Sequence, residues 1–184
     1  MMVQLKRWLI SAIVLPVFLI VIGCQSSTTV SPPNGVKETQ SPEKKTAEEF
    51  MELAAQGKLK GIEAGIGATK KEIIKMYGNP KSIGNSERGL NLFYEGFSFE
   101  FQEYLDSLDQ LKDEDKVLGI IADAKILGIN ATPAQLKVNY GSPSTEAYDD
   151  AHGTGWQMDY LAGERYLSFF AETNESAINT VYLR

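Results

Sequence analysis

Hydrophobic and polar side chains alternate in several segments of this 184-residue chain, which is the pattern of strands with one buried face. Phe97, Phe99 and Phe101 alternate strictly with polar residues, and residues 90–94 precede them across a two-residue turn at 95–96. This predicts an antiparallel hairpin with one apolar face. Further strands are predicted at 156–160 and 166–171, around a turn at 162–163, and after each hairpin at 117–122 and 178–183.

Helical spacing occurs before each predicted set of strands. Ile73 and Tyr77 lie four residues apart, as do Leu136 and Tyr140, so each pair forms the apolar stripe of a short helix. A capping box precedes each stripe: a threonine accepts a backbone amide, and a Glu or Gln reaches back to it. A glycine and a proline that stop a helix follow. These residues are Thr69, Glu72, Gly78 and Pro80 in the first helix and Thr132, Gln135, Gly141 and Pro143 in the second.

The two predicted helices lie in copies of one sequence. Residues 65–80 and 128–143 are identical at seven of sixteen positions, and the copies are 63 residues apart. We therefore predict an α+β fold: a tandem repeat of a short helical part followed by an antiparallel three-stranded unit. The copies extend over about 44–122 and 123–184 and form one compact domain, residues 44–184. A domain of this size buries roughly two thirds of its unfolded surface, so it needs no disulfides.

The N-terminal residues have the order of a secretory signal. Lys6 and Arg7 precede an uncharged apolar run at 8–22, and Cys24, the only cysteine, follows. This segment resembles the lipobox of bacterial lipoproteins, in which the cysteine is acylated and becomes the first residue after cleavage. We predict a signal peptide at 1–23 and a lipid on Cys24 that holds the protein on the extracytoplasmic face of the cell membrane. An uncleaved membrane helix is the alternative, although the run is shorter than the ~20 residues that span a bilayer.

Residues 24–43 are predicted to form a flexible tether. They are rich in Ser, Thr, Pro and Gly and lack apolar periodicity, so they cannot bury enough surface to offset the entropy of ordering them. A helix is predicted from Pro42, with Phe50, Leu53 and Ala54 as its apolar face. The alternative is a solvated helical end of the tether.

The charge balance excludes some partners. The net charge is −6, and removal of residues 1–23 takes away two basic residues, which leaves 16 basic against 24 acidic residues and a net charge of −8. Binding to nucleic acid depends on clustered Lys and Arg that neutralise phosphates, so we expect no nucleic-acid partner. An acidic surface is also not expected to bind the membrane, so the lipid on Cys24 alone is expected to hold the protein there.

The two copies differ most in two segments whose composition folding does not require. Residues 103–116 are acidic but lack the order of a calcium loop, and Tyr104, Leu108 and Leu111 have the spacing of a small amphipathic helix. Residues 148–156 contain the only histidine, which alone cannot build a zinc site, so we expect no metal or other cofactor. Loops on a rigid scaffold carry specificity, so we predict that a partner binds these loops and the open sheet face. The candidate residues are Glu103, Asp106, Asp109, Tyr148, His152 and Trp156.

The lipobox, residues 54–58 and the two capped helices that end in Tyr-Gly-x-Pro resemble the YjgB-like family of Gram-positive lipoproteins, a domain of unknown function. The resemblance covers about residues 50–184. More distantly, the repeated unit looks like β-lactamase inhibitor protein and the BamE lipoprotein, whose sheets bind another protein. This likeness implies a binding mode and transfers no residue.

These observations predict a lipoprotein without enzymatic activity that acts as a protein-binding or scaffold module at the cell envelope. Its predicted partner is an envelope or secreted protein. Two alternatives stay open. One is an envelope hydrolase that uses carboxylates brought together by folding, since the sequence has no Gly-x-Ser-x-Gly nucleophile elbow. The other is an inhibitor of a secreted or envelope enzyme, as the likeness to β-lactamase inhibitor protein implies.

Overall fold

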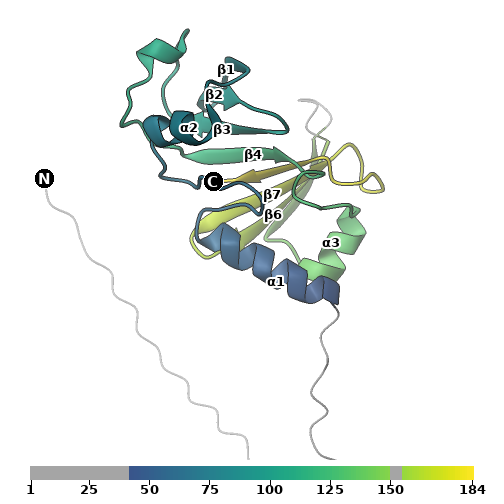
Figure 1. The fold of residues 1–184 in the computed structure, drawn as a ribbon. Coiled ribbons are helices and arrows are strands. Elements are labelled where there is room, and N and C mark those ends of the chain that lie inside the picture. The colour runs from purple at the N-terminus through teal and green to yellow at the C-terminus, as the bar shows by residue number, and fades with distance from the viewer. Residues whose placement is uncertain (1–41, 150–154) are drawn as a thin grey trace, which may run out of the picture. The chain divides into compact units, whose positions relative to one another are not determined.

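Three α-helices pack on an eight-stranded antiparallel sheet in the computed structural model, which describes residues 42–149 and 155–184 (Figure 1). The predicted α+β class is confirmed. None of the helices in these residues is long and apolar enough to cross a membrane. The helices are α1 (Pro42–Ala55), α2 (Lys70–Tyr77) and α3 (Pro133–Tyr140), and the strands are β1 (Ser82–Ser86), β2 (Gly89–Phe93), β3 (Phe97–Phe101), β4 (Gly119–Asp123), β5 (Thr145–Asp149), β6 (Gly155–Ala162), β7 (Arg165–Ala171) and β8 (Thr180–Leu183).

The sheet places the last strand of each half at its centre. Its order is β1-β2-β3-β4-β8-β7-β6-β5, and β4 pairs antiparallel with β8. Four strands follow α2 and four follow α3, so the prediction of three strands after each helix is wrong by one strand in each half. The strands that the sequence did not predict, β1 and β5, form the two edges of the sheet and have the sequences SIGNS and TEAYD. A polar edge strand carries no regular apolar alternation, which is why the pattern did not indicate it.

The helices α2 and α3 begin and end where the sequence predicts. The Thr69 amide donates to Glu72 Oε2 at 2.8 Å, and the Thr132 amide donates to Gln135 Oε1 at 2.8 Å. Each threonine hydroxyl accepts the amide of the same partner, so both capping boxes form. The glycines that end the two helices have positive φ angles, 76° at Gly78 and 82° at Gly141, which residues with a Cβ rarely adopt.

All three α-helices contact the same face of the sheet. Phe50 of α1 and Tyr140 of α3 both pack against Phe169 of β7, with ring centroids 6.4 and 5.4 Å apart. Tyr77 of α2 packs against Phe99 of β3 at 5.6 Å. Figure 1 shows α1 and α3 next to each other beside β6 and β7. This helix side carries the core, and no α-helix of the described residues covers the opposite side, which we call the open face.

The segment between β3 and β4 is less helical than predicted. One turn of 3-10 helix forms at Leu108–Gln110, and Tyr104, predicted on the apolar face of a helix, is 62% exposed. Leu111 is buried in the core, as expected of an apolar position. The backbone amides of Lys70 and Lys71, at the start of α2, donate to carbonyls of this segment at 2.9 and 3.1 Å. These bonds tie the segment to α2 and take up acceptors that a longer helix would use.

Candidate functional site

The open face carries the side chains that alternate with the core residues of each strand. Phe93, Leu161 and Tyr166 protrude from it and are 41%, 55% and 45% exposed. Ser98 and Ser168 are buried between large neighbours. The face therefore mixes exposed apolar and aromatic side chains with polar residues. The register places one row of side chains across all eight strands, in the order Ser82, Phe93, Ser98, Ile121, Tyr182, Ser168, Asp159 and Thr145.

Two arginines and two tyrosines lie next to one another on the open face, and we call Arg88, Tyr166, Tyr182 and Arg184 the arginine–tyrosine cluster. The Arg88 Cζ lies 5.5 Å from the centroid of the Tyr182 ring. The Arg184 Cζ lies 5.8 Å from the same centroid and 5.2 Å from that of Tyr166. A guanidinium within about 6 Å of a ring centroid is attracted to the face of the ring. The cluster therefore links the turn between β1 and β2 to β7 and the end of β8.

Two residues, Gly119 and Glu100, determine the position of the Tyr182 ring. Gly119 of β4 has no side chain, and a Cβ there would lie 2.7 Å from Tyr182 Cε2. The ring can therefore cross β4, and its hydroxyl donates to Glu100 Oε1 of β3 at 2.8 Å. Glu100 is 5% exposed, and its other oxygen accepts from Ser86 Oγ at 3.5 Å. Burial, and then the hydrogen bond to Glu100, raises the pKa of Tyr182 to about 12, so the hydroxyl stays protonated at neutral pH.

Neither arginine of the cluster has a carboxylate within 4.0 Å in the part of the chain that the structure describes. Glu100, the buried carboxylate next to the cluster, is engaged by Tyr182. Both guanidinium groups therefore lack a negative partner among these residues. The ion pairs found there all use lysines, and they join Lys70 to Asp113, Lys81 to Glu95 and Lys137 to Glu146.

The structure does not bring the predicted site residues together. Glu103, Asp106 and Asp109 are exposed in the segment between β3 and β4. Tyr148 of β5 and Trp156 of β6 lie near each other, with ring centroids 6.1 Å apart. The strand register puts this aromatic pair at the opposite end of the sheet from the acidic segment. The predicted residues therefore form two separate surfaces.

Trp156 and Tyr148 lie on the helix side of the sheet, away from the open face. The Trp156 Nε1 donates to Glu146 Oε1 at 3.0 Å. Glu146 also accepts from Lys137 Nζ of α3, at 2.8 Å, which ties β5 and β6 to a helix that covers this side. Trp156, Glu146 and Lys137 line a hollow of about 490 Å³. This surface is separate from the arginine–tyrosine cluster.

Two predicted residues, Cys24 and His152, lie outside the described residues. In residues 42–149 and 155–184, no group of three or more His, Cys, Asp or Glu side chains could hold a metal ion. The expectation that the protein has no metal site stays a prediction for the whole chain.

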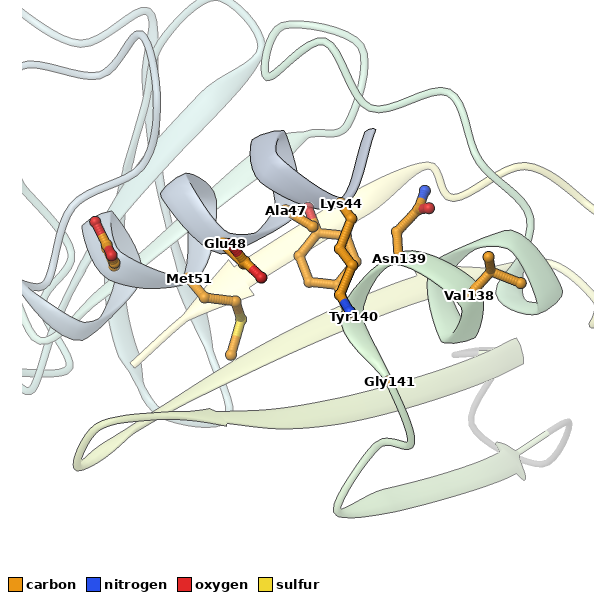
Figure 2. Close-up of a pocket in the computed structure, with 9 residues that line it drawn as sticks. Lys44, Ala47, Glu48, Met51, Val138, Asn139, Tyr140 and Gly141 are labelled. Atoms are coloured by element: carbon orange, nitrogen blue, oxygen red, sulfur yellow. The ribbon is translucent and has the colours of Figure 1, made fainter. Parts of the chain in front are cut away.

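A groove of about 470 Å³ separates α1 from α3 (Figure 2). Glu48 and Met51 line it from α1, and Val138 and Asn139 line it from α3. Val138 is 79% exposed. The charged groups of the groove, such as Lys44 and Glu48, are exposed to solvent. The groove can form contacts, but its residues suggest no catalysis.

The sequence analysis missed the arginine–tyrosine cluster because its members are far apart along the chain. Tyr166 and Tyr182 occupy open-face positions, one residue away from the buried Leu167 and Leu183. That alternation is the signal that could have found the tyrosines. Arg88 lies in a turn, and no local pattern indicates its neighbours. The pairing of β4 with β8 and of β7 with β8 brings the cluster together.

Comparison with solved structures identifies this fold in a DUF4309 family protein, YjgB, from Bacillus subtilis subsp. subtilis str. 168. The two structures align with a TM-score of 0.51 and 14% sequence identity, over 77% of this chain and 96% of that one. A cysteine-rich secretory protein from Staphylococcus aureus aligns with a TM-score of 0.41 and 12% identity, over 64% of this chain and 42% of that one. No protein-family model matches the sequence, and no curated protein matches it.

The likeness to β-lactamase inhibitor protein and BamE stays a prediction. The predicted resemblance to the YjgB-like family is confirmed in its fold, since this chain shares the fold of the DUF4309 family protein YjgB.

Proposed function

We propose that this protein is a non-enzymatic protein-binding module of the cell envelope, held on the extracytoplasmic face of the membrane by a lipid on Cys24. It binds an envelope or secreted protein through the open face of its sheet. One observation carries the proposal: exposed aromatic side chains and arginines without carboxylate partners in the described residues share one face. Tyr, Phe and Arg are enriched at protein interfaces, and Tyr and Arg often dominate their binding energy.

The open face has the size and rigidity that a protein partner requires. Seven spacings of about 4.8 Å between eight strands give a width of about 34 Å, enough for one side of an interface of standard size. Phe93, Leu161 and Tyr166 supply large apolar contacts. Because the paired strands already fix the backbone, binding costs little loop ordering. These properties favour a macromolecular partner over a small ligand, which would need a concave pocket.

One of the two divergent segments would contact a partner at the rim of this surface. The acidic segment 103–116 lies at one end of the strands, whereas the Tyr148–Trp156 pair lies at the other end and on the helix side. An acidic rim suits a partner with basic groups at the matching edge of its surface. Charges at a rim change the association rate and its salt dependence more than the affinity.

The proposal includes a tandem repeat of the helix-and-strand unit, four strands long in each copy. The two capping boxes match, and each copy ends in a strand at the centre of the sheet. The tyrosine that ends each helix has matching aromatic neighbours. The ring-centroid distances are 5.5 and 5.6 Å from Tyr77 to Tyr94 and Phe99, and 5.7 and 5.4 Å from Tyr140 to Tyr160 and Phe169.

The alternative of a carboxylate hydrolase has no observation in its favour. The open face has two buried carboxylates, Glu100 and Asp159, among the described residues. They belong to β3 and β6, which are four strand spacings, or about 19 Å, apart. Glycoside hydrolases keep their paired carboxylates about 5 to 9.5 Å apart. An inhibitor would be one form of the binding module that we propose, with an enzyme as its partner.

A photoreactive phenylalanine derivative at position 161 of the full chain, produced in cells, tests the proposal. Leu161 is 55% exposed on the open face, so its replacement leaves the core intact. The matched control carries the derivative at position 138, where Val138 is 79% exposed on α3. We expect irradiation to join position 161 to one envelope or secreted protein, identified by mass spectrometry, and to give no such product from position 138. No protein product at 161, or equal yields of the same product from both positions, would refute the proposal.

A further inference from the structure

We infer that the arginine–tyrosine cluster is a carboxylate-binding site, which receives an Asp or Glu side chain of the partner protein. The inference rests on the proposed function and adds the chemical identity of the contact at the centre of the open face.

The rings of the cluster hold the guanidinium groups in one place. A guanidinium that is attracted to a ring still has N–H groups available for hydrogen bonds. Arg184 lies within 6 Å of the Tyr166 and Tyr182 rings, and Arg88 lies near the Tyr182 ring. Rings that restrict an arginine in advance reduce the side-chain entropy that binding costs. An arginine edge matches a carboxylate with two parallel hydrogen bonds.

The local charge also leaves both guanidinium groups open to an external partner. The chain has a net charge of −6, yet no carboxylate of the described residues pairs with either arginine of the cluster. Glu100 accepts from Tyr182 and Ser86 and forms no ion pair with either arginine. Glu100 therefore positions the central ring and leaves the two guanidinium groups for a group outside the described residues.

The surroundings of the cluster favour a protein carboxylate over a lipid phosphate. Leu161 lies across from Tyr166 in the strand pairing, and Phe93 is exposed on the same face. Such side chains gain free energy when an apolar protein surface covers them. The occupant is therefore an acidic residue within an otherwise partly apolar protein surface.

The test measures the yield of the position-161 product in the full chain with Arg88→Gln or Arg184→Gln. We expect each change to lower the yield by about 10-fold or more, as the loss of hydrogen bonds to a charged group predicts. Arg184→Lys keeps the charge but loses the planar donor edge, so it should lower the yield as well. The matched control is Arg165→Gln, which changes an arginine outside the cluster and should alter the yield by less than about two-fold. Urea unfolding of each variant checks that it folds.

Mass spectrometry of the product then locates the partner segment, and a charge exchange completes the test. Arg184→Glu should abolish the product, and Asp or Glu to Arg in that segment should restore it. The inference is wrong if the arginine variants keep the parent yield, if the segment has no acidic residue, or if the product is a lipid or a second copy of this chain. If the parent chain gives no product, the proposed function itself is refuted. If the yield of the product does not change in the Arg88 and Arg184 variants, only the carboxylate site is refuted.

Discussion

A Cβ at position 119 should displace Tyr182 and destabilise the protein. In Gly119→Ala the new carbon would lie 2.7 Å from Tyr182 Cε2 and 3.1 Å from its hydroxyl oxygen. The ring must therefore move, and its hydroxyl must leave Glu100 Oε1, which it now contacts at 2.8 Å. Glu100 is 5% exposed, so water replaces that hydrogen bond poorly.

The structure gives both the sign and the size of this effect. The lost hydrogen bond to a charged acceptor is worth about 1.5 to 3 kcal/mol, and the cation–π contacts to Arg88 and Arg184 add about 0.5 to 1 kcal/mol each. Gly119 does not have a positive φ, so alanine fits the backbone and restores about 0.4 to 1 kcal/mol through the unfolded state. We expect Gly119→Ala to lower the free energy of unfolding by about 1.5 to 4.5 kcal/mol.

A double-mutant cycle with Tyr182→Ala separates the clash from other effects of the alanine. Without the ring, Gly119→Ala should be neutral or should stabilise by up to about 1 kcal/mol. Urea unfolding of residues 41–184, followed by the fluorescence of Trp156, measures all four variants. If Gly119→Ala changes the free energy of unfolding equally in both backgrounds, the ring does not depend on the missing Cβ and the account of the cluster fails.

Three further predictions concern other parts of the molecule. Cys24→Ala should end the incorporation of labelled fatty acid, and label that persists would exclude Cys24 as the site of the lipid. Tyr77→Ala and Tyr140→Ala should each cost about 2 to 4 kcal/mol in urea unfolding, less than a fully buried aromatic ring, and losses below about 1 kcal/mol at both sites would place the rings at the surface. Stability should fall as the pH rises from 10 towards 12, because the folded state keeps protons on buried tyrosines that the unfolded state releases, and an unfolding midpoint that stays constant over this range would contradict the raised pKa values. Burial raises the pKa to about 12 at Tyr94, Tyr140, Tyr160 and Tyr182.

The elements that the sequence predicts correctly are those with a local cause. Thr69 and Glu72 stand three residues apart, and their hydrogen bonds need only the helix that they start. The alternation of Phe99 and Phe101 with polar residues likewise indicates which side of β3 faces the helices, and Ser98 and Glu100 on the other side are buried as well. The edge strands β1 and β5 were not predicted because they have no apolar stripe of their own. Pairing with β2 and β6 holds them in place. Local signals therefore predict the helices and the inner strands.

The candidate site depends on contacts that no local pattern contains. Tyr182 and Glu100 are 82 residues apart in sequence, and their hydrogen bond forms because β8 inserts beside β4. Trp156 is predicted as a partner-binding residue of the divergent segment 148–156, but its position in β6 puts it on the helix side, away from the open face. The Tyr182–Glu100 contact and the position of Trp156 have one cause in common. The order of the strands and the side on which each residue lies are properties of the assembled sheet.

The central place of β8 determines when this protein can finish folding. Chain synthesis delivers β4 early, but its partner on one side is the last strand in chain order. Until β8 arrives, the backbone groups along one edge of β4 and of β7 have no strand to pair with, and the core lacks Val181 and Leu183. The sheet therefore closes only when residues 180–183 are free to pair, by a contact between strands more than fifty residues apart, and such long-range pairing favours slow closure.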